Sequence, residues 1–305
     1  MLSFFKLIRW KNLLMIALVQ LLIKYGLLEP FGAEVSLSEL GIALLILATI
    51  CIAAAGYIIN DINDIETDFI NKPNSIIIGK EISEKTAYTF FIALNVVGVG
   101  IGFYLSNTVN RAPFFSLFVI ISVLLYIYAT YLKSTPLIGN IVISILVALS
   151  IIIVGIFELL PATNPINQKI QFTFFRVIFD YALFAFSINL LREITKDIED
   201  IEGDTEANLN TLPIAIGKNR TITMLAILNF IPLIGTVFYV ISTLYKQPIV
   251  VGYFLIFIVA PLLYITIKTF SSETKKDYNL LSKMYKLVML FGMFSLLLYK
   301  YVILN

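Results

Sequence analysis

The chain has 305 residues, of which 59% are hydrophobic and only 14% are charged, with a formal net charge of +2. Soluble domains usually carry about 25% charged residues, so this composition favours a polytopic membrane protein and gives no reason to expect a nucleic-acid partner. The sequence has no histidine and one cysteine. This excludes histidine-based acid–base chemistry, Ser-His-Asp triads and an intrachain disulfide.

Nine segments are apolar and long enough to cross a hydrocarbon core of about 30 Å, which requires about 20 helical residues. They lie near 12–28, 37–59, 85–105, 114–132, 137–160, 173–191, 221–243, 248–269 and 284–303. Several of the breaks between them contain proline or glycine, which end helices. We therefore expect an all-α, polytopic membrane protein of about nine transmembrane helices, folded as a single domain over residues 1–305.

The polar connection after the second segment begins with a cluster of acidic residues. It reads Asn60-Asp61-Ile62-Asn63-Asp64-Ile65-Glu66-Thr67-Asp68. Residues three and four apart lie on one face of a helix, so Asp61, Asp64 and Asp68 are predicted to form a carboxylate stripe. Asn60 borders that stripe. We call residues 60–68 the first motif.

The same pattern returns 136 residues later, after the sixth segment. Seven of the eleven positions in 194–204 match those in 58–68. Asp197, Asp200 and Asp204 repeat the spacing of the first stripe, and Lys196 stands where Asn60 stood. We call residues 196–204 the second motif. One such motif is usually a solvated helix end, but a repeated pair favours a functional site.

The distribution of basic residues predicts the orientation of the chain. With the N-terminus inside, 16 Lys and Arg residues fall on the inner side and six on the outer side. This bias follows the positive-inside rule. Because each motif follows an even number of crossings, both are expected on the cytoplasmic side, where two carboxylate stripes can face one cavity. We expect an integral protein of the plasma membrane.

Two facing carboxylate stripes require countercharges. Mg²⁺ fits best, because it prefers oxygen ligands and is bound by one or two carboxylates together with substrate phosphates. The metal would neutralise charge on a departing diphosphate. The nearby cations Lys72, Lys133, Arg192 and Lys196 would hold phosphate oxygens. Asn12 would reach a substrate headgroup or cap the first helix.

These motifs resemble those of the UbiA superfamily of intramembrane prenyltransferases. The superfamily's first signature, NDxxDxxxD, is present as Asn60, Asp61, Asp64 and Asp68, and its DxxxD signature as Asp200 and Asp204 preceded by Asp197. The resemblance implies a helical bundle around a central cavity open to the membrane. It also implies that Mg²⁺ on both motifs binds a prenyl diphosphate, whose allylic cation is captured by an acceptor.

This resemblance assigns roles to individual residues. The implied metal ligands are Asn60, Asp61, Asp64, Asp68, Asp197, Asp200 and Asp204, and Asp64, Asp68, Asp200 and Asp204 are the catalytic candidates. The candidate substrate contacts are Lys72, Lys133, Arg192, Lys196 and Asn12. The chain departs from the superfamily after the first motif, where Ser75 stands at a basic position and isoleucines replace later prolines. A tyrosine that the pattern places at Ala129 is also missing; Tyr126, Tyr128 or Tyr131 would have to replace it.

Within the superfamily, 192–204 together with Thr211-Leu212-Pro213 is most similar to the geranylgeranylglycerol-phosphate geranylgeranyltransferases. Prenyl diphosphate, an acceptor and membrane lipid are then the partners, and no obligate protein partner is evident. Homogentisate prenyltransferases share much of this stretch, so an aromatic acceptor such as homogentisate or a naphthoate is the alternative. A cation-coupled transporter built from repeated halves is the alternative of another class.

Overall fold

The computed structural model describes residues 2–73 and 76–300 of the chain. Within these ranges, nine helical stretches are long and apolar enough to cross a membrane. They are Trp10–Phe31, Glu39–Asn63, Glu84–Thr108, Ala112–Thr130, Ile138–Glu158, Gln168–Glu199, Lys218–Leu244, Pro248–Phe270 and Lys275–Leu298. The nine predicted segments and the all-α class are confirmed, although residues 301–303 of the last predicted segment lie outside the described residues.

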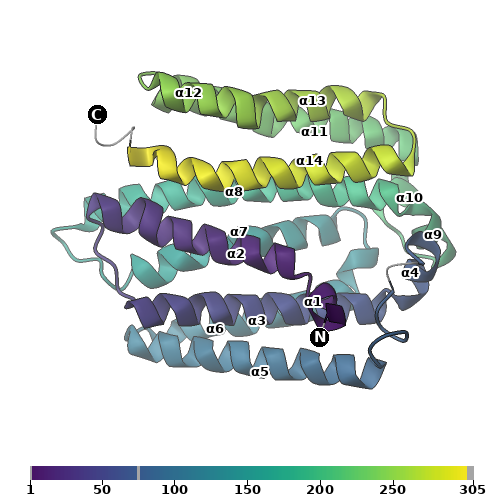
Figure 1. Cartoon of the computed structure of the whole chain (residues 1–305), viewed down its shortest axis with the longest axis horizontal. Coiled ribbons are helices and arrows are strands. Elements are labelled where there is room, and N and C mark those ends of the chain that lie inside the picture. Colours follow the sequence, from purple (N-terminus) through teal and green to yellow (C-terminus); the bar gives the residue numbers. More distant parts are fainter. Residues whose placement is uncertain (1, 74–75, 301–305) are drawn as a thin grey trace.

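The helices carry the labels used in Figure 1. The α-helices are α1 (Leu2–Leu7), α2 (Trp10–Leu21), α3 (Glu39–Asn63), α4 (Ile65–Asn71), α5 (Glu84–Thr108), α6 (Phe115–Thr130), α7 (Ile138–Glu158), α8 (Gln168–Glu199), α9 (Ile201–Glu206), α10 (Leu212–Ile216), α11 (Lys218–Tyr239), α12 (Pro248–Phe254), α13 (Ala260–Phe270) and α14 (Lys275–Phe294). Short 3₁₀ or π-helical segments continue or join them at Leu22–Leu28, Glu29–Phe31, Ala112–Phe114, Leu132–Ser134, Val240–Leu244, Leu255–Val259 and Ser295–Leu298.

Several helices begin at polar capping residues. The Ser38 hydroxyl accepts from the Gly41 amide at the start of α3, and the Ser83 hydroxyl accepts from the Thr86 amide at the start of α5. Thr274 and Asp277 form a reciprocal capping box at the start of α14. These side chains satisfy first-turn amides that would otherwise lack partners at the ends of membrane-spanning helices.

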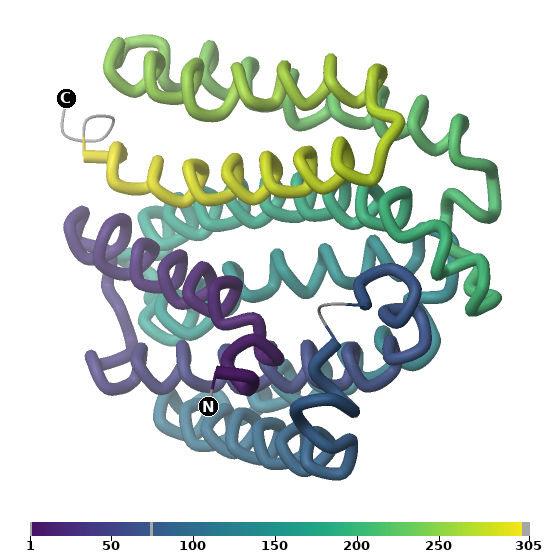
Figure 2. Tube along the Cα trace, turned by 45° about the vertical axis from the view of Figure 1, so that its right-hand side comes forward, coloured from purple at the N-terminus to yellow at the C-terminus, as the bar shows by residue number. Residues whose placement is uncertain are grey.

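The long helices lie roughly alongside one another, and the two motifs meet at one end of the bundle (Figure 1). α8 packs against α7, α14 and α11, while α3 packs against α5 and α6. The short helices α4 and α9, which continue the two motifs, pack directly on each other at the right of Figure 1. Figure 2 shows α1 (purple) lying across the motif-bearing half of α3. The fold thus joins two segments that are 136 residues apart in the sequence.

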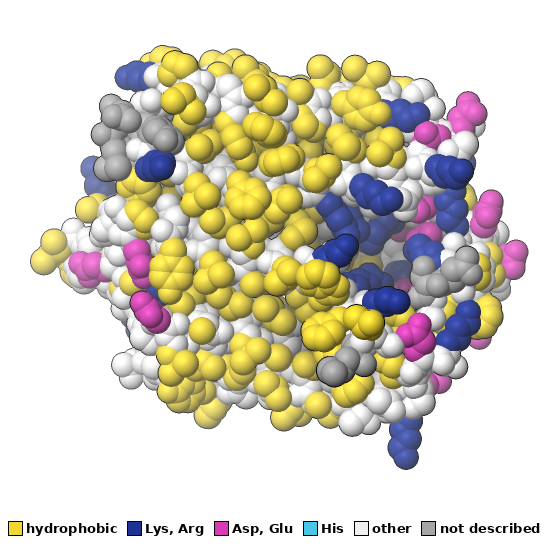
Figure 3. All heavy atoms as spheres, viewed as in Figure 1, with side chains coloured by type: hydrophobic (Ala, Val, Ile, Leu, Met, Phe, Trp, Pro, Cys, Tyr) yellow, Lys and Arg dark blue, Asp and Glu magenta, His cyan; other side chains and the backbone are white. Residues whose placement is uncertain are grey.

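The outer surface of the bundle suits a lipid environment. Large apolar side chains remain exposed along the helices, among them Ile92, Val96, Phe103 and Ile120. Figure 3 shows hydrophobic side chains covering most of this face, with charged side chains gathered at its two ends. Close helix contacts lie inside: a Cβ on Gly98 of α5 would meet the Ala48 carbonyl oxygen of α3 at 3.0 Å. The chain is an integral membrane protein.

A buried ion pair fixes the end of the bundle opposite the motifs. Lys24 and Glu158 are 1% and 0% exposed, and their Nζ and Oε1 atoms are 2.8 Å apart. Lys24 also donates to the Leu37 carbonyl, and Glu158 Oε2 accepts from the Leu37 amide. The pair therefore ties the end of α7 to the connection between α2 and α3.

Candidate functional site

The first motif crosses a helix break and does not form the continuous stripe predicted from the sequence. α3 ends at Asn63, Asp64 adopts φ −94° and ψ 4°, and α4 starts at Ile65. The Asp64 amide still donates to the Asn60 carbonyl, and the Asp68 amide donates to the Asp64 carbonyl. The backbone is thus redirected at Asp64 without losing these hydrogen bonds, so Asp61 and Asp68 project from helices of different direction.

The second motif breaks at the equivalent residue. α8 ends at Glu199, Asp200 adopts φ −99° and ψ 7°, and α9 starts at Ile201. The Asp200 amide donates to the Lys196 carbonyl and the Asp204 amide to the Asp200 carbonyl. The sequence repeat is therefore a structural repeat as well. The predicted single helical face is wrong for both motifs, for the same physical reason.

Basic side chains pair with both leading carboxylates of the first motif. Arg9 donates to Asp61 Oδ1 at 2.6 Å, and its guanidinium lies 5.0 Å from the centre of the Tyr57 ring. Arg9 separates α1 from α2 in a left-handed conformation (φ 51°), which is unusual for a residue other than glycine. Lys133, from the connection between α6 and α7, donates to Asp64 Oδ2.

Lys72 links the chain just after the first motif to the second motif. It follows α4, and its Nζ lies 2.7 Å from Asp200 Oδ2. Burial lowers the pKa of Lys72, but the combined effect of Asp200, Asp68 and Glu199 outweighs burial and leaves this pKa raised. Burial also lowers the pKa of Lys133, and the combined effect of Asp64, Asp204 and Asp68 leaves that pKa raised as well. Both ammonium groups therefore stay charged beside the carboxylates.

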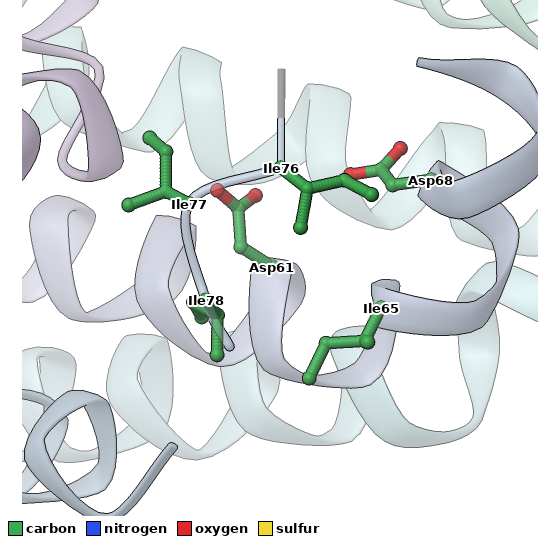
Figure 4. A pocket seen from close by; sticks show the side chains of 6 residues that line it. All are labelled: Asp61, Ile65, Asp68, Ile76, Ile77 and Ile78. Carbon is green, nitrogen blue, oxygen red and sulfur yellow. The ribbon is translucent and has the colours of Figure 1, made fainter. Parts of the chain in front are cut away.

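The last acidic residue of each motif is shielded from water. Burial raises the pKa of Asp68 and raises that of Asp204 to about 6. Asp61 and Asp68 both line a pocket of about 10 Å³, which has room for about one water molecule. Figure 4 shows these two carboxylates on the pocket wall with Ile65 and the chain at 76–78. The break at Asp64 brings the ends of the first motif around one space.

The start of the second motif is held from α7. Asn140 donates to Asp197 Oδ2 at 2.8 Å. Arg192 donates to Glu193 at 2.5 Å, and the Lys196 ammonium lies 3.4 Å from the same carboxylate. Arg192 and Lys196 thus lie near the site, but their carboxylate partner is Glu193 and not a motif aspartate.

Asn12 lies inside α2, so the prediction that it caps the first helix is wrong; Arg9 occupies the N-cap position. Asn12 donates to the Tyr57 hydroxyl at 3.1 Å and accepts from Lys286 at 3.2 Å. Of the three candidate tyrosines, Tyr126 and Tyr131 are exposed. Tyr128, by contrast, is partly buried.

The residues at the two breaks fit Mg²⁺. Among the described residues, Asp200 Oδ1 is buried without a hydrogen-bond partner, as a free ligand oxygen would be. The described chain gathers no set of three or more acidic, cysteine or histidine side chains that would enclose an ion on its own. One or two carboxylates per ion, completed by substrate phosphate, is the arrangement typical of Mg²⁺.

Sequence reasoning missed several residues at this end of the bundle. Arg9, Asn71, Asn140 and Glu193 contact motif residues, and Lys286 donates to Asn12. None of them belongs to the repeat. Arg9 and Lys286 are basic residues on the predicted inner side, which was the only sequence signal for them. Figure 3 shows Lys and Arg side chains gathered around a hollow at this end of the bundle, with acidic side chains beside them.

Comparisons with known proteins identify relatives of this chain. The sequence profile described as “UbiA prenyltransferase family” matches residues 14–301. The chain is 30% identical over 296 residues to the digeranylgeranylglyceryl phosphate synthase of Methanococcoides burtonii, which covers 96% of this chain and 98% of the relative.

Two solved structures share the fold. One, reported as “Structural and mechanistic insights into the biosynthesis of Digeranylgeranylglyceryl phosphate synthase in membranes”, has a TM-score of 0.61 at 22% identity over 97% of this chain and 98% of that one. The other is a UbiA homologue from Archaeoglobus fulgidus bound to DMAPP and Mg²⁺. Its TM-score is 0.59 at 17% identity over 97% of this chain and 99% of that one.

Proposed function

Because the chain belongs to the UbiA prenyltransferase family, we propose that it transfers a geranylgeranyl group from geranylgeranyl diphosphate to geranylgeranylglycerol phosphate, with Mg²⁺ as cofactor. The observation that carries this proposal is the Lys72–Asp200 ion pair, which brings a basic residue just after the first motif against a carboxylate of the second. The choice of acceptor is supported by the relative from M. burtonii, named for this product.

We assign two or more Mg²⁺ ions to oxygen atoms on both sides of the helix breaks, with one or two carboxylates per ion. The proposed ligands are Asn60, Asp61, Asp64, Asp68, Asp197, Asp200 and Asp204. When bound, Mg²⁺ would neutralise the charge that develops on the leaving diphosphate. Of these carboxylates, Asp64, Asp68, Asp200 and Asp204 lie at the breaks or beyond them, and we propose that they contact the reacting diphosphate through the metal.

Lysine side chains are the proposed diphosphate contacts. Lys72 and Lys133 each pair with the carboxylate at one of the two breaks, Asp200 and Asp64. When metal takes over these carboxylates, both ammonium groups become available for phosphate oxygens. Arg192 and Lys196 add positive charge beside Glu193, and Asn12 contributes an amide from α2.

The reaction breaks the bond between the first prenyl carbon and the diphosphate oxygen, and forms an ether bond from that carbon to the acceptor hydroxyl. The hydroxyl proton passes to a carboxylate of the second motif or to the departing diphosphate. We further propose that the chain forms one domain in the plasma membrane with both motifs on the cytoplasmic side. The basic residues support this orientation, because 16 of the 22 fall on the motif side.

The proposal is tested with purified protein, Mg²⁺ and labelled geranylgeranyl diphosphate against three acceptors: geranylgeranylglycerol phosphate, homogentisate and a hydroxynaphthoate. We expect label to enter the glycerol-phosphate lipid at a rate at least tenfold above either aromatic acceptor. Preferential labelling of an aromatic acceptor would reassign the substrate. No transfer to any acceptor, together with uptake of a tracer cation into proteoliposomes, would overturn the enzyme assignment in favour of a transporter.

A further inference from the structure

The two motifs differ in the side chain that hydrogen-bonds the backbone carbonyl at the helix break. At each break, the aspartate carbonyl accepts a hydrogen bond from the amide four residues later and also a second one from a side chain. In the first motif, the Thr67 hydroxyl donates to the Asp64 carbonyl at 2.9 Å. Thr67 lies three residues after Asp64, so the first motif supplies this additional hydrogen bond from within its own chain segment.

The second motif cannot do this, because Gly203 stands at the position equivalent to Thr67. The second hydrogen bond to the Asp200 carbonyl comes instead from α4, the short helix that continues the first motif. Asn71, the last residue of α4, donates its Nδ2 to the Asp200 carbonyl at 2.9 Å. Its Oδ1 accepts from the Gly203 amide at 3.1 Å. One neutral side chain, only 8% exposed, therefore satisfies one backbone group at the second break and one in the helix that follows it.

Gly203 has no Cβ, and this leaves the space that the Asn71 side chain occupies. A Cβ at residue 203 would lie 2.5 Å from Asn71 Nδ2 and 2.7 Å from Asn71 Cγ, both well below van der Waals contact. Gly203 lies inside helix α9, where other residues would be favoured for helix formation. The close approach of Asn71 is therefore the physical reason for glycine here.

Asn71 and Lys72 contact the same aspartate in different ways. Lys72 bonds the carboxylate of Asp200, which a metal ion would take over. Asn71 instead bonds the Asp200 carbonyl and the Gly203 amide, two backbone groups that follow that carboxylate in the chain, and so does not compete for it. The Lys275 ammonium in turn donates to the Asn71 carbonyl at 3.0 Å, which fixes the end of α4 to α14.

We propose that Asn71 is a positioning residue that sets the distance between the two acidic motifs, with Gly203 as its matching surface. Asn71 touches neither substrate nor metal. It acts through the Asp200 backbone, which it holds against the first motif while Lys72 exchanges partners. This inference rests on the metal-binding part of the proposed function and is independent of the acceptor.

The test measures Mg²⁺-dependent binding without turnover. The probe is a prenyl thiodiphosphate, whose sulfur bridge resists ionisation, and the readout is the Mg²⁺ concentration that gives half of the thermal stabilisation. We expect Asn71→Ala to raise this concentration about tenfold, since removing the partner that orients a metal ligand costs about 10- to 100-fold in affinity. Because no acceptor is present, a failure of the proposed acceptor chemistry would not affect this result.

Asn167 provides a matched control at the opposite end of the bundle. It is also 8% exposed, its Nδ2 donates to the Ala162 carbonyl at 3.0 Å, and its Oδ1 accepts from the Asn164 amide at 2.8 Å. Asn167→Ala is expected to lower thermal stability about as much as Asn71→Ala and to leave the Mg²⁺ midpoint unchanged. Equal Mg²⁺ midpoints for both variants and the wild type would overturn the proposal.

Gly203→Ala tests the same contact from the other side and serves if Asn71→Ala does not fold. We expect it to shift the Mg²⁺ midpoint in the same direction, because the new Cβ displaces the Asn71 amide. The double variant Asn71→Ala/Gly203→Ala should bind Mg²⁺ no more weakly than Asn71→Ala alone, since neighbouring changes in one contact are not additive. Additive shifts would mean that the two residues act separately, which contradicts the proposal.

Discussion

Single carboxylates at this site are neutralised by single basic residues. Asp61 pairs with Arg9, Asp64 with Lys133 and Asp200 with Lys72. The exposure of these pairs differs, and exposed ion pairs contribute little to stability. Residues of the site should therefore separate into those whose loss affects ligand binding alone and those whose loss also affects folding.

Lys72→Met should impair substrate binding with little effect on stability. The Lys72 side chain is 42% exposed, so its ion pair contributes at most about 1 kcal/mol to the free energy of unfolding. Loss of its charge-assisted bond to the diphosphate should raise the KM for geranylgeranyl diphosphate about tenfold. Steady-state kinetics and thermal unfolding in detergent measure the two effects. Lys85→Met, on an exposed residue in the first turn of α5, is the control and should change neither quantity.

Asp64→Ala and Asp200→Ala should each reduce turnover at least about 100-fold while the protein still folds. The reason is that each variant loses one carboxylate at a helix break, and no other motif residue occupies that position. Transfer of labelled prenyl groups measures the loss, and circular dichroism checks the helical content. Wild-type turnover in either variant would exclude a site built from both motifs.

At the scale of single residues, the sequence revealed the repeated side chains but not their partners. The repeat identified the six aspartates, and the structure places them at one end of the bundle. Asn71 and Arg9 carry no repeat and no periodic pattern, and each meets its partner only after the chain has folded. Such contacts depend on tertiary packing, which local spacing does not encode.

At the scale of helices, the sequence predicted the membrane spans but not the breaks within the motifs. Apolar length predicted the nine spans well, because a membrane imposes that length. The breaks at Asp64 and Asp200 were not predicted, since neither residue is proline or glycine and the aspartate spacing continues the helical period across the break. Only the change of backbone direction shows that the periodic pattern does not correspond to one continuous helical face.

The ion pair between Lys24 and Glu158 should dominate the stability of the end opposite the motifs. Glu158→Ala leaves the buried, charged Lys24 with only the exposed Glu29 carboxylate 3.8 Å away, and breaking a buried pair costs about 3 to 5 kcal/mol of unfolding free energy. The double variant Lys24→Met/Glu158→Leu should recover most of that loss, because it buries no charge. Thermal unfolding in detergent compares the two variants. A double variant less stable than Glu158→Ala would contradict this account.

The orientation of the whole molecule can be tested with thiol labelling in intact cells. The only native cysteine, Cys51, is 6% exposed and gives little background. Ile166, 95% exposed at the end opposite the motifs, should react as Ile166→Cys with an impermeant maleimide added outside. Lys80→Cys, near the motifs, should react only after lysis. The reverse pattern would place both motifs outside the cytoplasm.

The pairing of acidic and basic side chains also bears on how the protein matures. If only aspartates lined the cavity, their negative charges would repel one another in the newly inserted chain until a metal ion bound. Here Arg9, Lys133 and Lys72, from three separate connections, supply positive charges that offset this repulsion. The bundle can therefore assemble in the bilayer before it encounters magnesium or lipid precursor.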